Sequence, residues 1–513
     1  MNRSLVSFLL GACALSTTYT AGRLIAPFYG FGPLLVSASL AVSFLALGAG
    51  FLLAAQRPGS RSPGDAHRPG TGAAALLVAA AWTILVPWLR VAALATFERF
   101  GLRAAAILGT VLFAGVPLAA LGFGMGGSAR PSVATDADRS GGAAIAAALF
   151  GAAIAAPVVV WLSVPLLGVS RTLFVVGAVE AIAAWLARSG ARAGATAVPA
   201  VALLAISALS AGRFPAIARD AAHGLVEARE GPMLQYRVLD REDGRFLLAD
   251  GGIESLVSAE TRDALLRPAA ALQVLDLFFA QPESALVLGL RGGAVAKQFA
   301  RAGWKVRVVE PDPLAVRVAS DHLSFHASEV RLAVEDVRAF CRRDTSHYPV
   351  VILDAFGASA IPFHLITREA LATVAGRVAG DGTLALVLVT RGWNDPVICT
   401  LAAELHELFR SVLALPTGEP PDALGSVVML ASNRRLDLPD ERLPQPTDFL
   451  INPDEHWAVV QMNHAWFNRF EPPVRGAVIL TDDRNPIDLW SDPVQNAARA
   501  ELHRSFADAP TSW

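Results

Sequence analysis

The run SALVLGLRGG, Ser284–Gly293, decides the fold of the C-terminal half of the chain. It passes from a short apolar segment, the pattern of a buried strand, directly into a glycine-rich turn. Glycine at Gly289, Gly292 and Gly293 lets the backbone turn sharply and approach a ligand closely. A turn of this kind between a strand and a helix either binds a nucleotide-like molecule or is purely structural.

An acidic residue follows these glycines at an informative distance. Glu310 comes directly after a second apolar run, Lys305–Val309, and lies about 20 residues past the turn. A carboxylate at this spacing can accept hydrogen bonds from both hydroxyls of a ribose, so we expect Glu310 to bind a nucleoside. The alternative role, capping a helix, suits Asp312 better because Pro313 follows it.

Strands and helices alternate around this turn, which indicates a parallel sheet with helices on both faces. The expected strands are 284–289, 305–309, 330–334, 348–353, 383–389 and 426–430. The expected helices are 294–302, 313–323, 368–378 and 396–409. Upstream, residues 234–257 have the alternation and turns of a small β-hairpin unit, and 261–279 is a further predicted helix. We therefore predict an α/β Rossmann-like fold of the methyltransferase type, preceded by a small β-hairpin unit.

Two more acidic residues follow predicted strands, at the edge of the sheet where such folds bind ligands. Asp336 can accept a hydrogen bond from the exocyclic amine of adenine, with Val337 beside it, or it can cap the next helix. Asp354 follows the apolar run 348–353, which places it at the rim of the sheet. The alternative for Asp354 is a solvated loop acid.

The first 212 residues have the composition of a membrane region. Hydrophobic residues make up 53% of the whole chain and charged residues only 17%, against about 25% charged in soluble proteins, and most charges lie after Arg213. Apolar runs of about 20 residues can cross a bilayer as helices. Seven candidates are found, at Ser4–Gly22, Pro33–Ala55, Thr71–Phe97, Ala104–Gly124, Gly141–Ser170, Thr172–Ala187 and Ala193–Gly212. We expect an all-α transmembrane bundle of about seven helices, spanning the inner cell membrane several times.

Two features of this region allow alternatives. The start, Met1–Leu15, has the charge and apolar run of a signal peptide, but no small-x-small cleavage site follows and more spans come after it. We expect the first helix to be retained. Glu180 lies deep in the sixth apolar run, where acids are costly and often functional; alternatively it sits near a helix end and reaches water.

Charge and cysteine content exclude several kinds of function. The net charge is −2 and no basic run is present, which argues against nucleic-acid binding. Cys13, Cys341 and Cys399 are far apart in sequence, so they predict neither a metal site nor a disulfide framework. Small buried side chains are the simplest interpretation of all three.

From about Pro232 to Pro486 the sequence resembles the spermidine synthase family, and specifically its bacterial membrane-bound relatives, which join a multi-helix region to this catalytic fold. The matching stretches are Leu234–Tyr236, Leu247–Gly251, Val287–Gly289, Val309–Glu310, Glu335–Asp336, Leu353–Phe356, Ile361–Leu365, Thr367–Leu371 and Leu480–Asp483. Their order along the chain is more specific than any one of them.

The resemblance implies roles for individual residues. Glu310 would hold the ribose and Asp336 the adenine, while Gln235 and Pro362 would line the nucleoside pocket. Asp354 is similar to the catalytic aspartate of the family, which orients and deprotonates the attacking amine. A carboxylate suits this step because a protonated amine has no lone pair with which to attack a carbon.

The sequence also departs from the family pattern. Arg291 stands where the glycine loop of the family has an aspartate, Arg267–Ala271 replaces a Tyr-His-Glu cluster that binds polyamine, and 357–360 is neutral where a second acid is usual. The nucleoside half of the site is thus kept and the polyamine half largely lost. Arg291 would repel a donor ammonium and favour the carboxylate of S-adenosylmethionine, unless it turns to solvent or pairs with a nearby acid.

These features predict a membrane-bound, spermidine synthase-like transferase that uses S-adenosylmethionine or its decarboxylated form as donor. The family suggests aminopropyl transfer to an amine; the alternatives are an S-adenosylmethionine-dependent methyltransferase, or a transporter or sensor that binds a nucleoside without turnover. We expect domains at 1–212, 213–280 and 281–513. Expected partners are a small amine or other acceptor, the lipid bilayer and, as one candidate assembly, a second copy of the chain. The soluble part should face the cytoplasm, where the donor is made.

Overall fold

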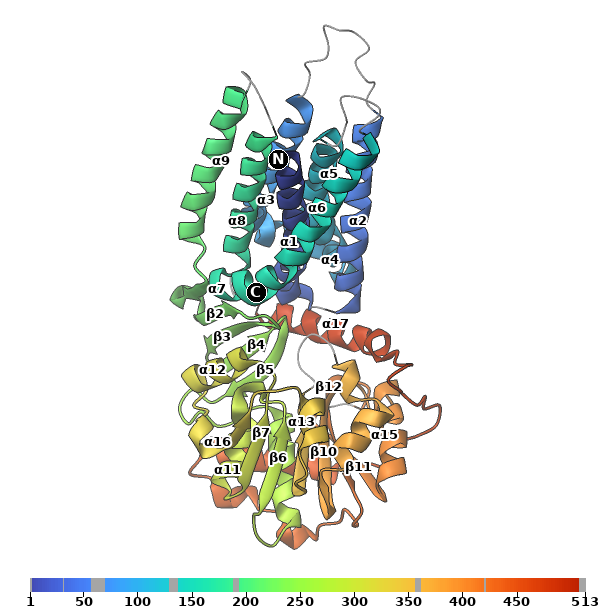
Figure 1. Ribbon diagram of the computed structural model, residues 1–513. Helices are drawn as coiled ribbons and strands as arrows, with labels where there is room; N and C mark the ends of the chain where they lie inside the picture. The colour runs from blue at the N-terminus through green and yellow to red at the C-terminus, as the bar shows by residue number, and fades with distance from the viewer. Residues whose placement is uncertain are drawn as a thin grey trace. The chain divides into compact units, whose positions relative to one another are not determined.

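The computed structural model describes residues 2–30, 32–56, 70–128, 137–187, 193–355, 361–418 and 421–506. Its contacts divide the chain into two compact units (Figure 1). The helical unit comprises Met1–Arg219 and Ala228–Gln235, and the α/β unit comprises Asp220–Glu227 and Tyr236–Ser512.

Within the described residues, the helical unit contains seven helices that are long and apolar enough to cross a membrane, the number expected. These stretches are Arg3–Tyr29, Pro33–Ala55, Thr71–Phe100, Leu102–Gly126, Gly142–Leu167, Val169–Leu186 and Thr196–Arg213. The α-helices that form them are α1 (Asn2–Tyr29), α2 (Pro33–Ala55), α3 (Gly70–Phe97), α4 (Leu102–Thr110), α5 (Val116–Ser128), α6 (Ala137–Val158), α7 (Val164–Leu167), α8 (Val169–Leu186) and α9 (Ala193–Arg213). Short π-helical turns join α4 to α5 and α6 to α7.

Small residues let these helices approach one another closely. A side-chain carbon added at Gly11 on α1 would lie 2.0 Å from the carbonyl oxygen of Ala148 on α6. One added at Gly151 on α6 would lie equally close to the carbonyl oxygen of Phe8. Glycine at both positions is therefore what allows the two backbones to touch.

Glu180 is fully buried inside the helical unit rather than near water. It lies on α8, six residues before the helix ends at Leu186. Among the described residues, neither of its carboxylate oxygens has a hydrogen-bond partner. The alternative that Glu180 reaches water from a helix end is therefore wrong.

The α/β unit is built around a seven-stranded sheet with the order β11-β12-β10-β9-β6-β7-β8 (Figure 1). Its strands are β6 (Ser284–Leu288), β7 (Lys305–Val309), β8 (Arg331–Ala333), β9 (Tyr348–Leu353), β10 (Val378–Arg391), β11 (Ser411–Pro416) and β12 (Leu424–Ser432). The neighbouring strands from β10 to β8 are parallel, whereas β12 is antiparallel to both β10 and β11.

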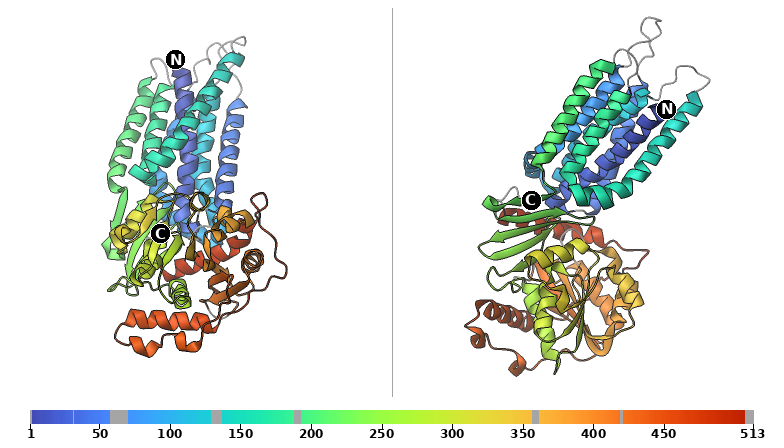
Figure 2. Two further views of the ribbon diagram at one scale, coloured as in Figure 1. Left: turned by 60° about the horizontal axis from the view of Figure 1, so that its bottom comes forward. Right: turned by 60° about the vertical axis from the view of Figure 1, so that its left-hand side comes forward.

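Helices cover both faces of this sheet (Figure 2). On one face Leu286 and Leu288 pack with α13 (Val337–Arg343), α14 (Arg368–Ala375) and α15 (Pro396–Leu408). On the other face Ala285 and Val287 pack with α11 (Ala294–Arg301), α16 (Pro453–Phe467) and the 3-10 helix Leu272–Phe278. This follows from the alternation of side chains along a strand that is buried on both sides. The helices are α10 (Arg267–Ala271), α11 (Ala294–Arg301), α12 (Pro313–His322), α13 (Val337–Arg343), α14 (Arg368–Ala375), α15 (Pro396–Leu408), α16 (Pro453–Phe467) and α17 (Ile487–Ser505).

A second sheet, which is larger than the expected hairpin unit, precedes this one in the chain. In place of one hairpin unit there are five strands in the order β1-β2-β3-β4-β5. They are β1 (Ile217–Asp220), β2 (Leu225–Glu230), β3 (Gln235–Arg241), β4 (Gly244–Ala249) and β5 (Gly252–Val257). The predicted hairpin corresponds to β3, β4 and β5, which pair antiparallel.

Two further expectations about the α/β unit need correction. The sheet is mixed rather than parallel, because the expected last strand, β12, runs antiparallel and pairs with the unpredicted β11. The predicted helix 261–279 begins only at Arg267, where Pro268 provides a favourable first turn. The residues before it bend back instead, with Ala264 bridged to Val257.

Candidate functional site

The glycine turn brings the backbone of β6 against the end of β9. Gly289 has a φ of +99°, and a side-chain carbon added there would lie 2.3 Å from the carbonyl oxygen of Asp354. Gly292 and Gly293 also have positive φ angles and press against Ser255 and Phe325. Glycine is therefore required both for the turn and for the close approach of these segments.

The register of the strands gathers the predicted site residues at one edge of the sheet. Leu288 on β6 pairs with Val309 on β7 and with Leu353 on β9. The next residues, Gly289, Glu310 and Asp354, consequently leave the sheet at the same level. The chain runs outward from β6 to β8 and then returns to β9 on the other side of β6. This is a topological switch point, where open α/β sheets bind their ligands.

Glu310 is held in place by backbone amides. Its Oε2 accepts a hydrogen bond of 2.9 Å from the N–H of Leu290, and its Oε1 accepts one of 2.9 Å from the N–H of Asp312. The side chain is almost fully buried, and this burial raises the pKa of Glu310 to about 7. Glu310 thus joins the glycine turn to the start of the next helix, with its charge sensitive to pH near neutrality.

Asp312 has the capping role expected of it. Its Oδ1 accepts from the N–H of Leu314, 2.8 Å away, at the start of α12. Its Oδ2 accepts from the hydroxyl of Tyr236 at 3.0 Å, so the capped helix is also tied to β3. The capping prediction for Asp312 is confirmed.

Asp354 and Arg291 form an ion pair. Arg291 also pairs with Glu254, an acid that was not predicted from the sequence as a site residue. Arg291 Nη1 donates to Asp354 Oδ1 at 2.8 Å, and Nε donates to Glu254 Oε2 at 3.0 Å. Burial alone would lower the pKa of Arg291, but the two carboxylates raise it overall. Of the environments considered for Arg291, pairing with a nearby acid is the one the structure contains. The one feature of the sequence that could have identified Glu254 is its position as an acidic residue inside the short strand β5.

Asp336 caps α13, which is one of the two roles expected for it; the other is to bind adenine. Its Oδ1 accepts from the N–H of Ala339 at 2.8 Å, while its Oδ2 lies 3.3 Å from Nε2 of His364. Val337, the first residue of α13, is buried in the core. Pro362 is partly exposed and precedes the 3-10 turn that carries His364. The structure therefore brings Asp336 and the Pro362 turn together, and the cap leaves Asp336 half-exposed.

Gln235 belongs to the helical unit by its contacts. Its Nε2 donates to Oε1 of Glu230, whose Oε2 accepts from Nη2 of Arg23 on α1 at 3.1 Å. Arg23 also donates to the carbonyl oxygen of Met233 at 2.9 Å. Gln235 is thus anchored by a buried ion pair that nothing in the sequence indicated.

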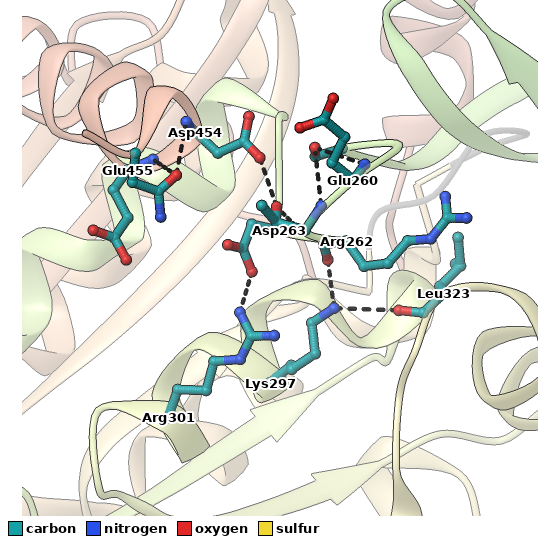
Figure 3. A network of polar contacts seen from close by, with 11 residues as sticks. Glu260, Arg262, Asp263, Lys297, Arg301, Leu323, Asp454 and Glu455 are labelled. Atoms are coloured by element: carbon teal, nitrogen blue, oxygen red, sulfur yellow. Dashed lines mark hydrogen bonds and ion pairs between the residues drawn. The ribbon is translucent and has the colours of Figure 1, made fainter. Parts of the chain in front are cut away.

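The helix after the glycine turn is fixed by a buried lysine. Lys297 on α11 donates to the carbonyl oxygens of Arg262 and Leu323 (Figure 3). Arg301, one turn later, pairs with Asp263. Burial lowers the pKa of Lys297 to about 8. These contacts hold residues 258–266 in a loop against α11, which explains why the predicted helix begins late.

Two stretches that match the family pattern meet beside α13. Arg338 binds Asp482 through two hydrogen bonds of 2.8 and 2.6 Å, and Thr367 donates to the same carboxylate at 2.7 Å. The Arg338 contact lowers the pKa of Asp482 to about 2. Of the matching stretch Leu353–Phe356, the structure describes the residues up to Ala355. Phe356 and the neutral residues 357–360 lie outside the described residues.

A sheet with a central switch point and an ordered series of carboxylates along one edge defines a Rossmann-like domain of the methyltransferase type. The chain is 32% identical over 221 residues to the polyamine aminopropyltransferase of Vibrio vulnificus (strain CMCP6), covering 42% of this chain and 71% of that protein. No family model matches the chain.

A probable spermidine synthase from Corynebacterium glutamicum ATCC 13032 has a TM-score of 0.41 at 16% identity, with 50% of this chain and 95% of that chain covered. Spermidine synthase from Thermotoga maritima has a TM-score of 0.37 at 14% identity, with coverages of 46% and 84%. The sequence identity to the Vibrio vulnificus protein shows that the chain belongs to the spermidine synthase (polyamine aminopropyltransferase) family and is a transferase.

Proposed function

We propose that this protein transfers the aminopropyl group of decarboxylated S-adenosylmethionine to a small amine, at the switch point between β6 and β9. The observation that carries the proposal is the convergence of Gly289, Glu310 and Asp354 at one level of the sheet edge. The relative in Vibrio vulnificus is named for the same transfer.

Each residue has a chemical task in this proposal. Glu310 accepts hydrogen bonds from the ribose hydroxyls, and the exposed side of Asp336 accepts from the adenine amine. Pro362 and Val337 border the adenine. Gly292 and Gly293 let the main chain come close to the donor.

Asp354 acts as the base. It removes a proton from the acceptor ammonium, and the freed lone pair attacks the propyl carbon attached to the sulfonium. The new N–C bond forms as the C–S bond breaks, and sulfur leaves with the bonding pair as neutral methylthioadenosine. The products are the alkylated amine, methylthioadenosine and one proton.

The surroundings of Arg291 are compatible with a decarboxylated donor. Its charge is compensated by Glu254 and Asp354, so it does not stand alone against the ammonium of the aminopropyl group. The guanidinium keeps N–H groups beyond these bonds, so methyl transfer from S-adenosylmethionine, whose carboxylate could use them, is the second candidate. Titration of both donors, and the mass of the product, separate the two reactions.

Glu310 makes donor binding pH-dependent. Since burial raises the pKa of Glu310 to about 7, the carboxylate that accepts from the ribose is fully formed only above that pH. We expect donor affinity to fall about tenfold per pH unit below 7, and Glu310→Ala to weaken binding by about 1–3 kcal/mol. Calorimetry from pH 6 to 8 measures both effects.

The matched control is Glu329→Ala, which removes an exposed acid from the same unit and should leave affinity unchanged. If Glu310→Ala binds as tightly as the parent at pH 8, Glu310 does not contact the donor.

We further propose that the seven apolar helices span the inner membrane and that the α/β unit faces the cytoplasm, where the donor is made. The support is the length and hydropathy of these helices, together with large apolar side chains exposed along them, such as Phe44, Leu45 and Leu209. Side chains of this kind are tolerated at a lipid-facing surface and form aggregation-prone patches in water.

This proposal predicts how the protein fractionates. The full-length chain is expected to sediment with membranes and to require detergent for extraction, because seven helices of 18 or more residues in the described part of the chain are apolar enough to partition into lipid. The fragment Arg213–Trp513, which lacks these helices, should remain in the supernatant. Recovery of the full-length chain in the supernatant without detergent would contradict the proposal.

A further inference from the structure

Glu180 is a buried acid of the helical unit that has no part in the proposed transfer. It lies on α8 and is fully buried, and among the described residues neither of its carboxylate oxygens has a hydrogen-bond partner. An ionised carboxylate in apolar surroundings is unfavourable unless a cation or hydrogen-bond donors compensate its charge. One physical explanation for a buried polar group without a partner is a bound ion.

Polar side chains of two other helices lie beside Glu180. Thr83 on α3 is fully buried, and its hydroxyl, which also lacks a hydrogen-bond partner in the described part of the chain, is adjacent to the carboxylate. Cys13 on α1 is buried as well, and its thiol donates to the carbonyl oxygen of Val176, one turn before Glu180, at 3.9 Å. Since α8 packs against both α1 and α3 (Figure 1), these side chains converge in the interior of the helical unit.

Arginines on the neighbouring helices do not neutralise Glu180. Arg23 on α1 pairs with Glu230 at 3.1 Å. Arg90 lies two turns after Thr83 on α3, and its electrostatic partner is also Glu230. Within the residues that the structure describes, Glu180 is therefore a carboxylate without a counter-ion.

The acceptors at this position match a primary ammonium group. Such a group has three N–H donors and no acceptor. The two carboxylate oxygens of Glu180 and the hydroxyl oxygen of Thr83 are three buried acceptors without partners among the described residues. A divalent metal ion fits less well, because Mg²⁺ and Ca²⁺ take about six or more oxygen ligands. The described residues also contain no group of three or more His, Cys, Asp or Glu side chains that could hold a metal ion.

We propose that Glu180 and Thr83 form a binding site for a primary alkylammonium ion inside the helical unit, with the carboxylate as its counter-ion. The site is separate from the proposed transfer, since both residues belong to the helical unit and the candidate base Asp354 belongs to the α/β unit. The helical unit then binds a ligand of its own.

The test compares three cations as chloride salts at equal concentration: propylammonium, tetramethylammonium and sodium. Thermal unfolding of the full-length protein in detergent is measured with each. Propylammonium is expected to raise Tm, because a ligand that binds only the folded state stabilises it. Tetramethylammonium has the same charge but no N–H donor, so neither it nor sodium should raise Tm.

Variants assign the effect to the site. Glu180→Gln should lower the affinity for radiolabelled propylammonium at least tenfold and abolish the rise in Tm, because the amide carries no charge. Thr83→Val, which removes one acceptor, should lower the affinity at least threefold. The matched control is Thr96→Val, which changes an exposed threonine on the same helix and should leave the affinity unchanged.

A rise in Tm that persists in a folded Glu180→Gln variant would overturn the inference, as would parent affinity in Thr83→Val. So would equal stabilisation by all three cations, or stabilisation by none. The comparison of cations uses the parent protein alone, so a misfolded variant does not remove the test. Formation of alkylated amine at the α/β unit is measured separately, so the two proposals can fail independently.

Discussion

Asp354→Asn is expected to lower the turnover of the proposed aminopropyl transfer by about 10²–10⁴. Asparagine has the same shape but cannot take the proton of the acceptor ammonium. Its amide oxygen can still accept from Arg291, whose Nη1 lies 2.8 Å from Oδ1 of Asp354. The geometry of the site and the affinity for donor should therefore be nearly intact, and single-turnover kinetics with calorimetry measure the two quantities separately.

The control for this variant is Asp240→Asn. Asp240 also pairs with an arginine, Arg245, but at the exposed hairpin of β3 and β4, so its removal should not change turnover. Unchanged turnover in Asp354→Asn would show that Asp354 is only a rim acid. Lost donor binding would instead assign it to the donor pocket.

Glu230→Leu is expected to lower the free energy of unfolding of the helical unit by about 3–5 kcal/mol, because it breaks a buried ion pair. Arg23 is 1% exposed and lies 3.1 Å from Glu230. Thermal unfolding in detergent measures the change.

The double variant Arg23→Met with Glu230→Leu separates charge from packing. An apolar pair of similar volume removes both charges of this ion pair, so it should recover much of the lost stability. A single variant as stable as the parent would contradict the prediction, as would a double variant no better than the single one.

Two of the strands nearest the site, β7 and β9, could be predicted from sequence to the residue, whereas β6 ends one residue earlier than predicted. Lys305–Val309 and Tyr348–Leu353 are short, largely apolar runs with polar ends, and such runs are compatible with a strand buried on both faces. The positions of Gly289, Glu310 and Asp354 follow, because parallel strands end at a common edge. The roles of these residues stay predictions until the donor is bound.

Contacts between distant elements could not be predicted in this way. Glu254 is 37 residues from Arg291 in sequence, and Asp354 is 63; no local spacing relates them. The strand β11 was missed because it is defined by antiparallel pairing with β12. The helix expected from Thr261 failed for a related reason, since Lys297, far along the chain, binds the carbonyl oxygen of Arg262.

The scarcity of lysine offers a way to determine the topology of the chain. Only Lys297 and Lys305 are present in 513 residues, and Lys297 is buried with its amine bonded to two carbonyls. Lys305 is exposed at the first residue of β7, the end of the strand opposite Glu310. A membrane-impermeant amine reagent added to sealed vesicles of known sidedness should therefore modify one lysine, away from the candidate site. Whether Lys305 is labelled before or only after the vesicles are opened reports which compartment contains the α/β unit.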